Sequence, residues 1–160
     1  MPADLMELLV AGVATRFKCP DAPPVPPGYI AIPDEPFLGT VGPVYRRRTA
    51  GGYWDIGCRA LPCHGNRFGR VHGGMLATLA DYALGFNLLA GADPGLQLAT
   101  VSLNIDFQAG ARIGEWIEAS VSIDKQIGRI RFATGLLRGG AGQLLLRASG
   151  VFSAVKVVGS

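Results

Sequence analysis

A histidine, two glycines and an aspartate stand close together near the middle of the chain, as His72-Gly73-Gly74 and Asp81. The residues around Asp81 are apolar on nearly all sides, which predicts a core helix that buries this carboxylate. A buried carboxylate is costly unless it is paired, hydrated or functional. The two glycines leave backbone N–H groups open at the positive end of the helix dipole, where a developing oxyanion could bind. These residue types therefore predict a functional carboxylate and an oxyanion site.

A helix and six strands must position these residues. The apolar run predicts a helix from about residue 73 to 89, closed by Gly91 and Pro94. Alternating apolar residues and glycine turns predict the strands 41–49, 53–60, 98–108, 115–126, 129–138 and 143–156. The last three should form an antiparallel meander. The simplest assembly is an α+β fold in which an antiparallel sheet wraps around one apolar helix.

Residues 1–37 are predicted to form an extension to the domain at 38–160. Leucines at helical spacing predict an amphipathic helix at 3–17. The proline-rich stretch 19–36 is expected to be a stiff extended linker and not a strand. The extension could pack against the outside of the domain, cap a dimer or cover a substrate pocket.

The composition narrows the class of protein. The chain has 160 residues, 49% of them hydrophobic and 17% charged, which favours an oligomer with partly covered surfaces. Its net charge of +3 is too small and too scattered for nucleic-acid binding. The three cysteines do not have the spacing of a disulfide framework, which predicts a reducing compartment. Cys58, Cys63 and His64 lack the fourth ligand of a structural zinc site, so no metal is expected there. No secretion signal or membrane span is expected at 3–17, so the predicted location is the cytoplasm.

A wider motif surrounds the central residues. It consists of Asn66, Gly69, His72-Gly73-Gly74 and Asp81, followed by residues 101–107 and 114–118. This pattern resembles the PaaI-like branch of the 4-hydroxybenzoyl-CoA thioesterase superfamily, from about residue 40 to the end. The resemblance implies a hotdog fold and an acyl-CoA thioesterase that needs no metal and no cofactor beyond the coenzyme A of its substrate. A non-catalytic module that binds or senses acyl-CoA is the alternative, and the acyl group stays open.

The resemblance also implies roles for the central residues. The Gly73 N–H would polarise the thioester carbonyl, with Gly74 beside it, and Asp81 would act as general base or nucleophile. Eight helical residues separate Gly73 from Asp81, a rise of about 12 Å, whereas a reacting atom must lie about 3 Å from both groups. The site should therefore combine Gly73 of one subunit with Asp81 of another, in a homodimer or a dimer of dimers.

Other candidate residues lie in the loop and on the later strands. Asn66 would hold the carbonyl or the attacking water, or else make local backbone bonds. His72 would orient the loop or contact substrate, or else cap the helix. Thr100 matches a family position that places water, with Ser102 as a rival two residues on. The coenzyme A phosphates would be held by basic side chains, for which the candidates are Arg67, Arg70, Lys125, Arg129 and Arg138.

Overall fold

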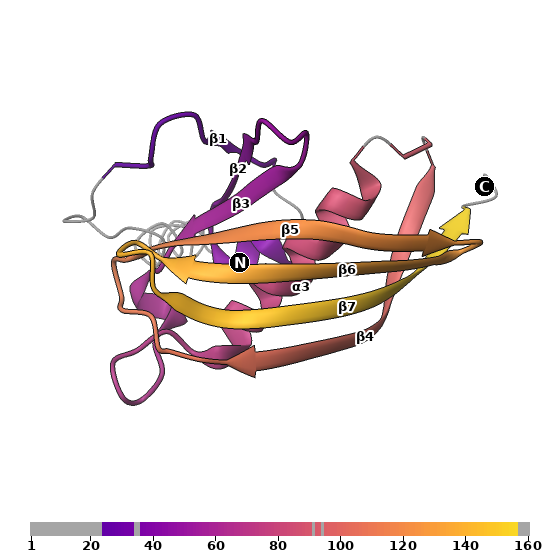
Figure 1. Ribbon diagram of the computed structural model, residues 1–160. Helices are drawn as coiled ribbons and strands as arrows, with labels where there is room; N and C mark the ends of the chain where they lie inside the picture. Colours follow the sequence, from indigo (N-terminus) through magenta and orange to yellow (C-terminus); the bar gives the residue numbers. More distant parts are fainter. Residues whose placement is uncertain (1–23, 34–35, 91, 94, 157–160) are drawn as a thin grey trace, which may run out of the picture.

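A computed structural model describes residues 24–33, 36–90, 92–93 and 95–156. One long helix, α3 (Gly73–Leu89), lies against one face of a seven-stranded antiparallel sheet (Figure 1). The predicted helix at 3–17 and the predicted helix-closing residues Gly91 and Pro94 lie outside the described residues. No helix in the described ranges is both long enough and apolar enough to span a membrane.

The strands follow the order β1-β2-β3-β5-β6-β7-β4 across the sheet. Their bounds are β1 Ile30–Ala31, β2 Val44–Arg48, β3 Trp54–Arg59, β4 Leu96–Phe107, β5 Trp116–Ile127, β6 Ile130–Gly139 and β7 Leu144–Lys156. All six predicted strands are present, and β5, β6 and β7 form the predicted meander. The strand predicted at 41–49 begins only at Val44, because Val41 belongs to a short helix, α2 (Leu38–Val41). A 3-10 turn, η1 (Pro62–His64), lies in the loop before α3.

The prediction that residues 19–36 contain no strand is wrong at Ile30 and Ala31. These two residues pair with Arg46 and Tyr45 of β2 and add a seventh strand at the sheet edge. The nearby prolines do not prevent this pairing, because Ile30 and Ala31 keep the backbone N–H and C=O groups that the sheet uses. Side chains also hold this edge to the sheet.

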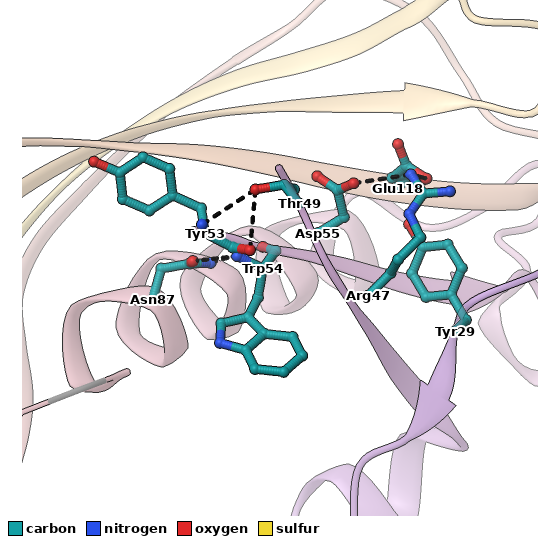
Figure 2. A network of polar contacts seen from close by, with 8 residues as sticks. All are labelled: Tyr29, Arg47, Thr49, Tyr53, Trp54, Asp55, Asn87 and Glu118. Atoms are coloured by element: carbon teal, nitrogen blue, oxygen red, sulfur yellow. Dashed lines mark hydrogen bonds and ion pairs between the residues drawn. The ribbon is translucent and has the colours of Figure 1, made fainter. Parts of the chain in front are cut away.

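That edge is fastened by a polar network around Arg47 (Figure 2). The Arg47 guanidinium donates to Asp55 at 2.8 Å and to Glu118 at 3.1 Å, so it links three strands. The hydroxyl of Tyr29 donates to Glu118, and burial raises the pKa of Tyr29 above its ordinary value of 10.0. The hydrogen bond to Glu118 favours the neutral phenol further. The residue before β1 is therefore tied to β5.

One face of α3 supplies the centre of the core. Its buried residues recur in pairs four apart along the helix: Met75, Leu76, Leu79, Ala80, Ala83, Leu84, Asn87 and Leu88. Opposite this face the strands carry glycines, and a Cβ on Gly150 of β7 would lie 2.9 Å from a methyl group of Leu84. Small residues on the helix and the strands therefore let the sheet approach α3 closely.

Asp81 does not belong to this buried face. It lies on the other side of α3 and is only half-buried, so the prediction that the helix buries its carboxylate is wrong for the single chain. The apolar sequence around Asp81 reflects a helix with one fully buried face and one partly covered face. The polar side chain that α3 does bury is Asn87, which is 2% exposed.

Asn87 connects the C-terminal part of α3 to β3 (Figure 2). Its Oδ1 accepts the backbone N–H of Trp54 at 2.8 Å, and its Nδ2 donates to the Trp54 carbonyl at 2.9 Å. Nδ2 also donates to the Ala83 carbonyl at 3.0 Å. A buried amide with its donors and its acceptor paired has a structural role, and here it fixes the start of β3 on the helix.

Candidate functional site

Asp81 of α3 and Thr100 of β4 face each other. The hydroxyl of Thr100 donates to Oδ1 of Asp81 at 3.0 Å. The helix presents Asp81 on its partly covered face, and β4 runs along this side as the terminal strand of the sheet (Figure 1). This bond orients the carboxylate and leaves Oδ2 without a hydrogen-bond partner in the described part of the chain.

Thr100 and Ser102 lie on opposite faces of β4, although a spacing of two residues in a regular strand puts both on one face. The register shifts between them: Thr100 is opposite Phe152, and Ser102 is opposite Val151, so Val101 forms a β-bulge. Ser102 accepts from Asn104 at 3.4 Å on the face away from α3. The structure therefore brings Thr100 to Asp81 and turns Ser102 away.

A cavity of about 330 Å³ opens beside Asp81. Its lining, from α3, β4 and the start of α2, is mostly apolar and consists, besides Asp81, of Phe37, Leu38, Gly74, Ala77, Thr78, Tyr82 and Leu103. Phe37 is 62% exposed, a high value for a large apolar side chain. The site thus joins one carboxylate to an open, largely apolar space that a small organic group could occupy.

The start of α3 holds the second half of the predicted chemistry. Nδ1 of His72 accepts the Gly74 N–H at 2.9 Å, so His72 is the N-cap of the helix and the predicted capping role is the one observed. No acceptor in the described residues takes the Gly73 N–H. A Cβ on Gly73 would meet the Phe107 ring at 3.4 Å. Gly73 therefore leaves one helix N–H open, whereas the N–H of Gly74 is already bound.

Asn66 organises the loop before the helix. Its Oδ1 accepts the N–H groups of Phe68 at 2.9 Å and of Arg70 at 3.1 Å. Gly69, with a φ of 72°, completes the tight turn. Asn66 thus makes the local backbone bonds that were the alternative to a role in binding substrate. Its Nδ2 has no acceptor among the described residues. This amide nitrogen remains available to a ligand.

His64 ties the loop to α2, a role that the sequence analysis missed. Its Nδ1 accepts the Leu61 N–H at 3.0 Å, its Nε2 donates to the Val41 carbonyl, and its own carbonyl accepts the N–H of His72 at 2.7 Å. Burial lowers the pKa of His64 below its ordinary 6.5, so the ring is neutral near pH 7. Pro62, a residue favoured at the first position of a helical turn, is the sequence signal that His64 belongs to an ordered turn.

The cysteines do not converge on His64. Cys58 is buried in the core, where desolvation raises its thiol pKa to about 12, and Cys63 is exposed. Within the described ranges, no group of three His, Cys, Asp or Glu side chains is arranged to hold a metal ion.

The candidate phosphate-binding side chains occupy two ends of the sheet. Arg67 and Arg70 lie in the loop before α3, and the Arg67 guanidinium stacks 4.7 Å from the centre of the Phe68 ring. Lys125 and Arg129 lie near the β5–β6 turn, at the other end (Figure 1). Arg138 lies near the β6–β7 turn, about 26 Å along β6 from the first turn at 3.3 Å per residue. One chain does not bring the two groups together.

Comparison with known proteins places these features in a family. Residues 68–135 match the model of the thioesterase superfamily. The chain is 36% identical over 129 residues to a Pseudomonas aeruginosa protein named "Putative esterase PA0474", which covers 80% of this chain and 96% of that protein. The chain belongs to the thioesterase superfamily. The predicted enzyme class, a thioester hydrolase, is confirmed with it.

Solved structures of similar proteins share the fold. Zebra fish thioesterase superfamily member 2 aligns with a TM-score of 0.65 and 28% identity, over 76% of this chain and 87% of that one. A Bacillus halodurans protein, BH2602, whose structure contains CoA, aligns with a TM-score of 0.65 and 24% identity, over 69% of this chain and 73% of that one. The predicted hotdog fold of this superfamily member is therefore confirmed. Its assignment to the PaaI-like branch stays a prediction.

Proposed function

We propose that this thioesterase hydrolyses acyl-CoA or aryl-acyl-CoA esters to the free acid and coenzyme A. The observation that carries the proposal is the hydrogen bond of 3.0 Å from Thr100 to Asp81 at the edge of an apolar cavity. The bond orients a carboxylate toward a space that fits an acyl group. The solved relative that contains CoA supports coenzyme A as the other half of the substrate.

The proposed mechanism divides the work between the helix start and the carboxylate. The Gly73 N–H, which has no acceptor among the described residues, polarises the thioester carbonyl and stabilises its oxyanion. Asp81 activates a water molecule or attacks the carbonyl carbon itself. Thr100 holds the carboxylate in place, and the free amide nitrogen of Asn66 donates to the carbonyl or to the water. His72 caps the helix and so keeps the Gly73 N–H in position.

We further propose that the complete site forms between two copies of the chain. Gly73 and Asp81 are separated by about 12 Å of helix, too far for both to reach one carbonyl. β4 is a terminal strand of twelve residues with no neighbour on its outer side in the described chain, and its Val101 is 62% exposed. A long open edge of this kind is suited to pairing with a second copy. A homodimer or a dimer of dimers would then place Gly73 of one subunit opposite Asp81 of the other.

The coenzyme A phosphates would lie at the surface, on basic side chains. Arg67 and Arg70 are adjacent in sequence to the proposed oxyanion site and can bind the same substrate molecule. Arg138 lies near the β6–β7 turn, at the same end of the sheet as Arg70. Lys125 and Arg129 lie at the other end, where a second subunit could bring them closer. A cytoplasmic location, no metal and no separate cofactor remain part of the proposal.

The experiment is thiol release from short, medium, long and aryl acyl-CoA esters, by the wild type and by Asp81→Asn. We expect turnover by the wild type and at least a hundredfold lower turnover by the variant, about 2.7 kcal/mol of barrier. Asp124→Asn is a matched control, because Asp124 accepts a threonine hydroxyl, that of Thr134, at the same 3.0 Å but on an exposed strand position.

Two outcomes would contradict this function. Equal loss of turnover in the Asp81 and Asp124 variants would assign the effect to protein stability. No turnover of any ester, together with tight acyl-CoA binding that the Asp81 substitution leaves unchanged, would favour the non-catalytic binding or sensing module.

A further inference from the structure

The short helix α2 forms one wall of the cavity beside Asp81. Phe37, the N-cap of α2, and Leu38, its first residue, both line that cavity. Leu38 is 6% exposed and belongs to the hydrophobic core, so it anchors the helix. Thr78 and Tyr82 of α3 line the same cavity. The cavity therefore lies between α2 and the helix that carries the carboxylate.

Phe37 is the large apolar side chain of this wall that the chain leaves uncovered. It is 62% exposed, and its ring stacks on no aromatic ring or guanidinium group in the described ranges. Burial of such a ring against an apolar ligand is favourable, and the lining of the cavity is mostly apolar. Phe37 is therefore placed to contact an apolar group that enters the cavity, whereas Leu38 is committed to the core.

A buried histidine holds α2 in place. The Nε2 of His64 donates to the carbonyl of Val41, the last residue of α2, and its Nδ1 accepts the Leu61 N–H at 3.0 Å. Gly42 then ends the helix with a φ of 112°, a value that favours glycine. A helix of four residues is too short to be stable alone. Its position therefore depends on the His64 bond and on the buried Leu38.

The same histidine is bonded to the start of α3. Its backbone carbonyl accepts the N–H of His72 at 2.7 Å, and His72 caps the helix by accepting the Gly74 N–H. The ring of His64 thus fixes α2, while its backbone fixes the residue that precedes Gly73. One residue outside the cavity lining holds the wall of the cavity and the open N–H of Gly73 in a single arrangement.

We infer that α2 selects the acyl group of the substrate, with Phe37 as the residue that contacts this group and His64 as the residue that positions α2. This inference rests on the proposed function, which supplies the ligand, an acyl-CoA ester. In that function the carbonyl lies within reach of Asp81, and the cavity opens beside Asp81, so the acyl group extends into the cavity. Phe37 then limits how much of the cavity the acyl group can use. His64 contacts no substrate and acts only through α2.

The first test measures selectivity among acyl groups. The kcat/KM of the full chain is measured for straight-chain acyl-CoA esters of increasing length, with the wild type and with Phe37→Ala. Removing the ring takes a contact from short acyl groups and opens space for long ones. The ratio of long-chain to short-chain kcat/KM should therefore rise about tenfold, the scale on which apolar pockets discriminate. An unchanged ratio overturns the inference.

Tyr53→Ala is the matched control for Phe37→Ala. Tyr53 is an exposed aromatic residue in the turn between β2 and β3, and it does not line the cavity. Its substitution removes a ring of similar size and should leave the ratio of long-chain to short-chain kcat/KM unchanged. An equal rise in both variants would overturn the inference, because the effect would not depend on the cavity.

Two substitutions of His64 separate positioning from stability. His64→Gln keeps an amide N–H that can reach the Val41 carbonyl, whereas His64→Asn keeps an acceptor near the Leu61 N–H and loses the Val41 bond. Each variant lacks one buried hydrogen bond, so both should unfold more easily. His64→Asn should shift the selectivity in the direction of Phe37→Ala, and His64→Gln should retain the wild-type ratio. Equal shifts would overturn the inference, because selectivity would then follow stability and not the position of α2.

Direct binding distinguishes failure of this inference from failure of the proposed function. Calorimetric titration uses a short and a long S-alkyl-CoA thioether, which cannot be hydrolysed, and coenzyme A itself. Phe37→Ala should alter the preference between the thioethers and keep the wild-type affinity for coenzyme A, and this result upholds the inference even if no ester is turned over. An unaltered preference overturns it even if esters are hydrolysed. A loss of coenzyme A affinity as large as the loss for the thioethers also overturns it, since the substitution would then have damaged the whole site.

Discussion

Asp81 and Asn87 lie six residues apart on the same helix and have opposite surroundings. Asn87 is 2% exposed and makes three hydrogen bonds to backbone groups. Asp81 is half-buried, accepts one bond from Thr100 and lines a cavity. A polar group whose bonds are all made within the chain stabilises the fold, whereas a charged group left partly unsatisfied beside a cavity is available for chemistry. The two positions should therefore respond differently to substitution.

The largest expected effect is the loss of activity without loss of stability at Asp81. Asp81→Asn should lower turnover at least a hundredfold, yet its melting temperature should stay close to that of the wild type, because its amide can still accept the Thr100 hydroxyl. Activity and thermal unfolding are measured on the same preparation. A variant that unfolds several degrees lower would show that Asp81 is structural after all.

Asn87 should show the reverse pattern. Asn87→Ala leaves the N–H and the carbonyl of Trp54 without their side-chain partners in a buried place, which should lower the free energy of unfolding by about 2 kcal/mol. Denaturant unfolding measures this, and turnover per folded molecule should change little. Asn104→Ala, at an exposed position of β4, is the control. Equal stability of the two variants would remove the distinction drawn between Asn87 and Asp81.

Thr100 and Ser102 of β4 should also respond differently to substitution, because only Thr100 contacts Asp81. Thr100→Val removes the hydrogen bond to the carboxylate and should lower kcat about tenfold, which corresponds to about 1.4 kcal/mol of barrier. Ser102→Ala should leave kcat unchanged because the bulge at Val101 turns Ser102 to the other face. A larger loss in the Ser102 variant than in the Thr100 variant would show that Ser102, and not Thr100, serves Asp81.

The smallest expected effect is the pH dependence contributed by His64. Its pKa is lowered by burial in the folded chain, so the unfolded chain binds more protons below its ordinary pKa of 6.5. Stability from His64 is therefore present above that pH and is lost as the pH falls through it. Melting temperatures between about pH 7.5 and about pH 5.5 measure the loss. His64→Gln should reduce this pH dependence, and an unchanged dependence would assign it to other groups.

The sequence predicts the regular elements well because their apolar patterns are long. The helix at 73–89 has the predicted bounds, and the last three strands form the predicted meander. The two-residue strand at Ile30 escaped prediction because so short a pairing leaves no periodic pattern between prolines. Its place in the sheet depends on contacts with Arg46 and Tyr45, which are distant in sequence.

The candidate site was predictable in its residue types but not in its geometry. The carboxylate and the glycines of the helix start were recognised from spacing, and Thr100 was named without a basis for preferring it to Ser102. Only the pairing of β4 with β7 reveals the bulge that separates these two. The burial of Asn87 rather than Asp81 was likewise hidden, because both lie in an apolar helix and differ only in which face meets the sheet.

The strand order has a consequence for how the molecule assembles. β4, which carries Thr100, is paired in the sheet only with β7, whose residues Val151 and Phe152 flank the bulge. During synthesis α3 and β4 leave the ribosome before β7. Until β7 has emerged, β4 lacks the strand it pairs with, and Thr100 is not held beside Asp81. A chain that stops before β7 would keep every residue from Asn66 to Thr100 and still lack the strand that holds Thr100 beside Asp81.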